Sequence, residues 1–132
     1  MNLLDIQDTI QDVANEYIEG DVLKSANLIN RKDTKYPLLS YDLMGLTRND
    51  DYNTYQYQFI IADKFTNEED KDLHFNNEME LMEDILKDLE EEHNIIYQLP
   101  LNYKFNSLKF VDILDVTLVD VVLMVNNDTD CR

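Results

Sequence analysis

The sequence is poor in the residues on which several common protein classes depend. Its 132 residues include one cysteine, two glycines, two prolines and no tryptophan. The single cysteine, Cys131, cannot form an internal disulfide, which argues against the disulfide-built fold of a small secreted domain. Two glycines cannot supply a glycine-rich phosphate-binding loop. The sequence also contains no HExxH, CxxC or serine-elbow motif, so no recognisable catalytic site is present.

Basic residues and long apolar runs are also scarce. The chain has 11 basic and 28 acidic residues, for a net charge of -17. This charge disfavours non-specific binding to nucleic acid or to an anionic membrane surface, because carboxylate and phosphate repel each other. The longest apolar-rich stretch, residues 113–125, is interrupted by two aspartates, so we expect no membrane span. The first residues lack a basic segment followed by an apolar run, so we expect no signal peptide and synthesis in the cytoplasm.

The spacing of the apolar residues predicts the secondary structure. They make up 44% of the chain, which is enough for a packed core. Steps of three and four residues predict two amphipathic helices, and alternation of apolar and polar residues predicts strands. Gly20 is expected to stop the first helix, and residues 48–51 are expected to form a turn. The predicted helices cover about residues 2–19 and 73–92, and the predicted strands 36–44, 55–61, 99–105 and 116–125.

The order of these elements predicts the fold class. Helix, strand, strand, helix, strand, strand is typical of an α+β protein in which an antiparallel sheet of about four strands carries two packed helices. We expect a single domain over residues 1–125 and a flexible C-terminal tail over residues 126–132.

Acidic residues are concentrated on and before the second predicted helix. Four of them, Glu80, Asp84, Asp88 and Glu92, are four residues apart and form one acidic stripe. Like charges at this spacing destabilise an isolated helix by roughly 0.2–0.5 kcal/mol per pair. A solvated helix face is the simplest interpretation of the stripe. Its energetic cost also favours a second one, a surface that faces DNA without binding it or contacts a basic partner.

Tyrosines cluster in and around the first predicted hairpin. Tyrosine is common at protein–protein interfaces and also on half-buried strands, so both interpretations stay open. Asp120 interrupts an apolar strand, and we expect it to face solvent, to pair with Lys104 or Lys109, or to lie at a subunit contact. The residues that we assign to a candidate subunit interface are Tyr52, Tyr55, Tyr57, Lys109 and Asp112.

Metal binding and carboxylate chemistry find little support in the sequence. His74 and His93 lie 19 residues apart, with no second ligand at zinc spacing, and both are expected to be exposed to solvent. The oxygen-rich segments 49–53 and 126–130 do not match a calcium-binding EF-hand loop. We therefore expect no metal, no cofactor and no enzymatic activity, and we rank a metal-dependent hydrolase far behind a binding or assembly protein.

Three segments together resemble the small neck and tail-completion (tail terminator-like) proteins of tailed bacteriophages. The first two are Tyr36-Pro37-Leu38-Leu39 and the strand Tyr55–Phe65, which leads through acidic residues into a long amphipathic helix. The third is the closing stretch from Leu99 to Val125, with Phe105 and Lys109-Phe110-Val111-Asp112 before its last strand.

This resemblance implies a structural virion protein without enzymatic activity. Such a subunit forms a homo-oligomeric ring at the head–tail junction and contacts other neck, tail or portal proteins. DNA passes through the ring, and an acidic surface would repel it. An alternative that suits the composition equally is an acidic cytosolic inhibitor, of the immunity or DNA-mimic type, that masks a basic partner.

Overall fold

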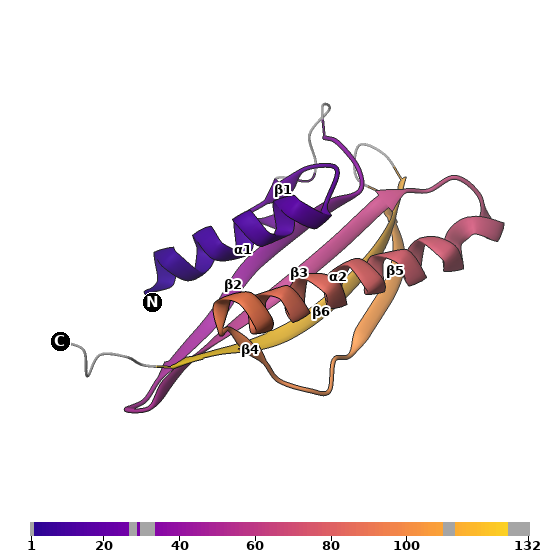
Figure 1. The fold of residues 1–132 in the computed structure, drawn as a ribbon. Helices are drawn as coiled ribbons and strands as arrows, with labels where there is room; N and C mark the ends of the chain where they lie inside the picture. The colour runs from indigo at the N-terminus through magenta and orange to yellow at the C-terminus, as the bar shows by residue number, and fades with distance from the viewer. Residues whose placement is uncertain (1, 27–28, 30–33, 110–112, 127–132) are drawn as a thin grey trace.

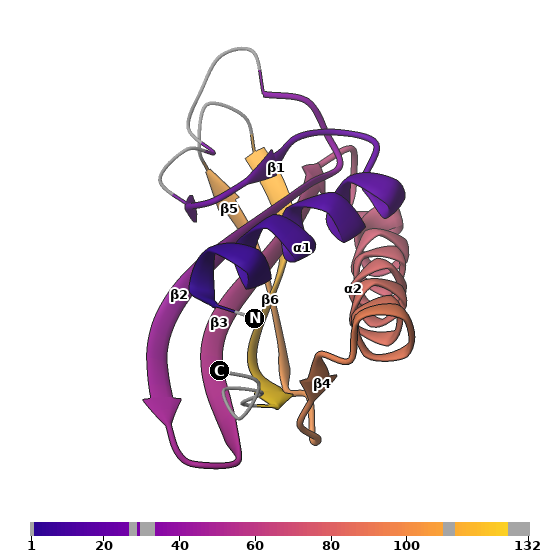
Figure 2. The same cartoon turned by 60° about the vertical axis from the view of Figure 1, so that its left-hand side comes forward.

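The computed structural model places two helices on one side of a curved sheet (Figures 1 and 2). We describe residues 2–26, 29, 34–109 and 113–126. The helices are α1 (Leu3–Tyr17) and α2 (Lys71–His93), and a short 3-10 turn, η2 (Glu68–Asp70), precedes α2. The strands are β1 (Val22–Leu23), β2 (Leu38–Arg48), β3 (Tyr52–Lys64), β4 (Ile96–Tyr97), β5 (Tyr103–Lys109) and β6 (Ile113–Asn126).

The sheet confirms the α+β class but differs from the four antiparallel strands that the sequence predicts. It has six strands in the order β1-β2-β3-β6-β4, and β5 also pairs with β6. All neighbours are antiparallel except β1 and β2, which are parallel. The two additional strands, β1 and β4, have two residues each, and such short segments carry no detectable apolar alternation.

The ends of α1 follow from local chemistry. Asn2 caps the helix: its side chain accepts a hydrogen bond from the backbone N–H of Asp5 at 2.9 Å, and the Asp5 carboxylate accepts one from the backbone of Asn2 at 3.0 Å. The helix ends at Tyr17 because Ile18 is extended. Gly20 is therefore not the C-cap that the sequence predicts. Its backbone N–H instead donates to the carbonyl oxygen of Pro37 at 3.0 Å, which fastens the end of α1 to the start of β2.

Other boundaries also differ from prediction. β2 continues through Gly45 to Arg48, with an irregularity between Leu43 and Gly45, so only the tip of the hairpin forms the turn. Helix α2 runs to His93 and ends at Asn94, which adopts the left-handed conformation (φ 58°). The strand predicted over 99–105 is observed at Tyr103–Lys109, and Leu99 is exposed.

The main core lies between the sheet and the two helices. Residues of one parity in β3 face it, including Tyr55, Tyr57 and Phe59, as the alternation predicts. A smaller apolar cluster covers part of the opposite sheet face, around Ile29, Leu38, Ile60, Ala62, Leu114 and Val116. Asp120 also lies on that opposite face and is exposed, which confirms the first of its three predicted environments. Its nearest described partner is the side chain of Gln58, at 3.5 Å.

Candidate functional site

The predicted acidic stripe is present on α2, but its four members differ in environment. Glu80, Asp84 and Glu92 are exposed. Asp88 is half-buried against α1, and its carboxylate accepts a hydrogen bond from the hydroxyl of Tyr17 at 2.8 Å. One member of the stripe therefore joins the two helices, and the other three form an acidic surface.

The predicted subunit interface is wrong in part. Tyr55 and Tyr57 are each 1% exposed in the core beneath the helices, so neither can contact a partner. Tyr52 is half-buried and Lys109 is exposed at the end of β5. Asp112 lies outside the described residues. Both residues share the parity of Phe59 in β3, which also faces the core.

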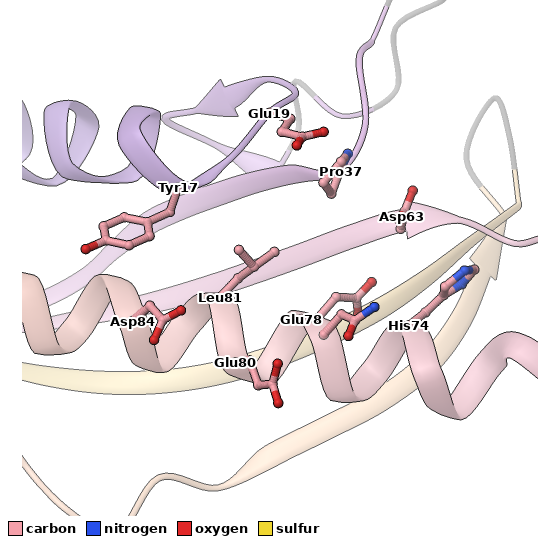
Figure 3. A pocket seen from close by; sticks show the side chains of 10 residues that line it. Tyr17, Glu19, Pro37, Asp63, His74, Glu78, Glu80, Leu81 and Asp84 are labelled. Carbon is pink, nitrogen blue, oxygen red and sulfur yellow. The ribbon is translucent and has the colours of Figure 1, made fainter.

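A pocket opens between the end of α1, the start of β2, the end of β3 and the first half of α2 (Figure 3). Its volume is about 340 Å³, within the range of small-molecule sites. Tyr17, Pro37 and Leu81 supply apolar wall. The remaining lining residues are polar or acidic, and they are Glu19, Asp63, His74, Asn77, Glu78, Glu80 and Asp84. We call this the acidic pocket.

Glu78 is the functional candidate that the sequence interpretation missed. It is not one of the four residues of the acidic stripe, and it is only 2% exposed. One carboxyl oxygen, Oε1, accepts a hydrogen bond from the hydroxyl of Thr117 at 2.7 Å. The other, Oε2, is buried and has no partner at hydrogen-bonding geometry. Its position in the sequence indicates burial, because Glu78 lies three residues after Phe75 and four before Met82, on the apolar stripe of α2.

Burial dominates the protonation of Glu78. It raises the pKa of the carboxyl group from 4.5 to about 9. The hydroxyl of Thr117 and the nearby backbone amide of Asp63 lower this pKa in part, whereas the charges of Asp63 and Asp115 raise it further. At neutral pH Glu78 is therefore a protonated acid in a pocket with acidic walls.

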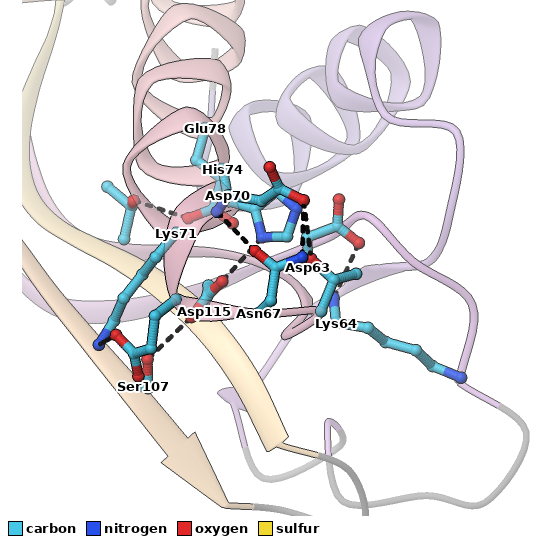
Figure 4. Close-up of polar contacts among 12 residues, drawn as sticks. Asp63, Lys64, Asn67, Asp70, Lys71, His74, Glu78, Ser107 and Asp115 are labelled. Atoms are coloured by element: carbon cyan, nitrogen blue, oxygen red, sulfur yellow. Dashed lines mark hydrogen bonds and ion pairs between the residues drawn. The ribbon is translucent and has the colours of Figure 1, made fainter.

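His74, Asp115 and Ser107 form a second polar group beside Glu78 (Figure 4). The Nδ1 atom of His74 lies 2.7 Å from one carboxyl oxygen of Asp115, and the hydroxyl of Ser107 donates to the other at 2.8 Å. The predicted solvent exposure of His74 is thus wrong: its side chain is 15% exposed, and that of Asp115 is fully buried.

These three residues have the composition of a serine–histidine–aspartate triad but not its order. In a catalytic triad the histidine lies between the serine and the aspartate, so that it can accept the hydroxyl proton. Here Asp115 lies between the other two residues: it contacts both His74 and Ser107, and no described hydrogen bond joins His74 to Ser107. This arrangement orients side chains across α2, β5 and β6 and does not activate the hydroxyl group.

Metal ligation finds no geometric support in the described part of the chain. Within residues 2–26, 29, 34–109 and 113–126, no three histidine, cysteine or acidic side chains are arranged to hold a metal ion. Over the same residues, neither helix has the length and apolar character that crossing a membrane requires.

The bond from Thr117 to Glu78 can be tested with an isosteric variant. We expect Thr117→Val to lower the free energy of unfolding by about 1–3 kcal/mol, because a buried carboxyl oxygen loses its donor. Urea denaturation would measure the loss. Thr54→Val, on the sheet face away from the helices, is the control and should change stability by less than about 0.5 kcal/mol. Equal losses of stability in the two variants would mean that the hydrogen bond from Thr117 to Glu78 contributes no more than the hydroxyl group of Thr54.

Both edges of the sheet are open in the described residues. On one side, β1 pairs only with Leu39 and Ser40, and beyond Ser40 the edge of β2 that faces away from β3 has no described strand beside it. On the other side, β5 pairs with β6 alone. Each open edge carries exposed apolar side chains: Met44 and Leu46 on β2, and Phe105 and Leu108 on β5.

Comparison with known proteins assigns no function to the chain. The sequence matches no protein-family model, and a search of curated proteins gives no match.

Proposed function

We propose that this chain is a structural subunit that assembles head-to-tail into a ring, as in the neck or tail-completion proteins of tailed bacteriophages. The observation that carries the proposal is the pair of open sheet edges, each bearing exposed apolar residues. The resemblance of residues 36–65 and 99–125 to those phage proteins gives the proposal its biological setting, the head–tail junction of the virion.

Two different open edges are what a ring requires. A ring forms when one surface of each subunit binds a different surface of the next, and the rotation closes. Unpaired strand edges bind other strands readily through their backbone N–H and C=O groups. The β5 edge of one copy and the β2 edge of the next supply such a pair, and Leu108 and Leu46 add apolar contact area.

The acidic surface of α2 fits a channel through which DNA moves. Glu80, Asp84 and Glu92 are exposed on one side of the helix, and the whole chain carries a charge of -17. Carboxylates facing a lumen would repel phosphates and let DNA pass without adhering. In this arrangement the ends of the ring contact neighbouring neck, tail or portal proteins.

The oligomeric state tests the proposal. We expect native mass spectrometry at increasing concentration to show a closed oligomer of fixed copy number. Leu108→Lys should weaken assembly at least about tenfold, because it places a charge in an apolar contact. Leu4→Lys is a matched control, since Leu4 is exposed on α1 and belongs to neither edge strand. A chain that stays monomeric at every concentration, or that loses assembly equally in both variants, would contradict the proposal.

A second candidate function follows from the same acidic surface. The exposed side of α2 also carries Glu83, Glu90 and Glu91, with Lys87 as the one basic residue among residues 78–92. An acidic inhibitor or DNA mimic would use this surface to cover a basic partner. It predicts a one-to-one complex with a basic protein and no ring, so the same mass measurement separates the two functions.

A further inference from the structure

We infer that the acidic pocket binds the terminal ammonium or guanidinium group of an alkyl chain, with Glu78 as the anion at its base. This site is separate from the open sheet edges and does not depend on ring assembly. The argument rests on the charge of the lining, on the unpartnered oxygen of Glu78 and on the shape of the pocket.

The charge of the lining selects a cation. Five of the ten lining residues carry a carboxyl group, and none is lysine or arginine. The acidic residues come from separate parts of the chain: Glu19 follows α1, Asp63 ends β3, and three others lie on α2. The fold therefore gathers carboxyl groups from three places around one cavity, which favours a positive group there over a negative one.

Glu78 gives the pocket a defined base. Its side chain lines the cavity and is almost completely buried, and its Oε1 atom is fixed by Thr117. Oε2 lacks a partner of good geometry. A buried polar atom without a hydrogen bond is unfavourable, and once Glu78 ionises this oxygen is an acceptor that a donor entering from the cavity would satisfy. An ammonium or guanidinium group supplies the missing donor together with the missing charge.

The walls favour an organic cation over a metal ion. Tyr17, Pro37 and Leu81 present apolar surface, against which an alkyl chain can pack while its charged end reaches Glu78 (Figure 3). The cavity of about 340 Å³ is about ten times the volume of one water molecule in the liquid, which suits a chain of several carbons. The described residues offer no triad of metal ligands, and the Nδ1 atom of His74 is already bonded to Asp115.

Binding should be coupled to the ionisation of Glu78. A cation beside this carboxyl group lowers its pKa, which burial holds near 9 in the free protein, so binding releases a proton at neutral pH. The surrounding titratable groups are Tyr17 and Glu19 from the α1 side, Asp63 from β3, Asp115 from β6, and His74, Glu80 and Asp84 from α2. Affinity should increase by up to about tenfold per pH unit as pH rises toward 9.

Isothermal titration calorimetry of the full chain at physiological salt tests the inference. The probes are n-butylammonium, n-butylguanidinium, and the capped amino acids N-acetyl-lysine amide and N-acetyl-arginine amide, with 1-butanol as the neutral control. We expect at least one cation to bind with a Kd of about 1 mM or tighter. Heats measured in buffers of different ionisation enthalpy should show release of about one proton at pH 7.

Two variants separate the pocket from the general negative charge of the protein. Glu78→Gln keeps the shape of the side chain and should weaken binding at least about tenfold and abolish proton release. Glu91→Gln makes the same chemical change at an exposed position of α2 outside the pocket. It should leave both the affinity and the proton release unchanged. Tighter binding of the capped amino acids would identify the occupant as a side chain of a partner protein, and tighter binding of the butyl cations would identify it as a free amine.

Three results would overturn the inference. The first is the absence of binding by every cation at about 10 mM, which is well above the expected Kd. The second is binding that the two variants weaken equally, because the cations would then be responding to net charge alone. The third is binding of 1-butanol as tight as that of the cations.

Discussion

Replacement of Gly20 by alanine is expected to lower the free energy of unfolding by about 3 kcal/mol or more. A Cβ atom at this position would overlap the backbone carbonyl oxygens of Lys35 and Pro37. Backbone atoms cannot rotate away as a side chain can, and overpacking of this kind typically costs about 1–3 kcal/mol and sometimes more. The glycine is needed for this close approach and not for an unusual dihedral angle, since no glycine of the described chain has positive φ.

The surrounding hydrogen bonds explain why the two segments cannot move apart to accept a methyl group. The N–H groups of Gly20 and Asp21 donate to Pro37 and Lys35, each at 3.0 Å, and the Asp21 carboxylate accepts from the backbone N–H of Lys35 at 3.1 Å. These bonds align β1 with β2. Separating the segments would break them and would displace Glu19 and Pro37, which line the acidic pocket.

Gly45→Ala provides the control for Gly20→Ala. A Cβ atom on Gly45 would meet only the end of the Gln56 side chain, at 3.1 Å, and that side chain can rotate. We expect a change below about 1 kcal/mol. Thermal denaturation of both variants checks the pair, with a fall in Tm of roughly 10 °C expected for Gly20→Ala alone. Similar melting temperatures for both would show that the contact of Gly20 with β2 is not tight in solution.

Periodicity in the sequence predicted the long elements but not the way in which they are joined. The steps from Ile6 to Ile10 to Val13 predicted α1, and the alternation from Tyr55 to Ile61 predicted β3 and its buried face. The parallel pairing of β1 with β2 depends instead on contacts of Gly20 and Asp21 with residues about 15 positions later. A two-residue strand held by such contacts has no local signal.

The candidate site was less predictable than the fold, because acidic residues are too abundant for type alone to be informative. Glu78 and Glu80 are both glutamates on α2, yet one is buried and the other exposed. What distinguishes Glu78 is its position on the apolar stripe, four residues after His74 and four before Met82. Asp115 likewise has the parity of Val119 and Val121, which face the core. In both cases the position of the residue within the apolar repeat indicates that its side chain is buried.

Glu78→Gln is expected to stabilise the protein by an amount that grows with pH. In the native protein burial raises the pKa of Glu78 from 4.5 to about 9. Between these two values the unfolded chain binds fewer protons than the folded one at this residue, so the wild-type protein loses stability as pH rises. Glutamine does not ionise, and its side chain can retain a hydrogen bond with Thr117.

The difference in unfolding free energy between Glu78→Gln and wild type should therefore rise by about 1.4 kcal/mol per pH unit, or roughly 4 kcal/mol from pH 5 to pH 8. Urea denaturation at several pH values measures it. Taking the difference removes the repulsion among the other acidic residues, which affects both proteins alike. Unpaired amide hydrogens of the glutamine change the unfolding free energy by an amount that does not depend on pH. The slope of the difference against pH is therefore the decisive quantity. Glu91→Gln should show no comparable slope, since Glu91 is exposed. A flat difference for Glu78→Gln would mean that the carboxyl group is solvated and ionised in the folded protein, which would also remove the buried acceptor on which the cation site depends.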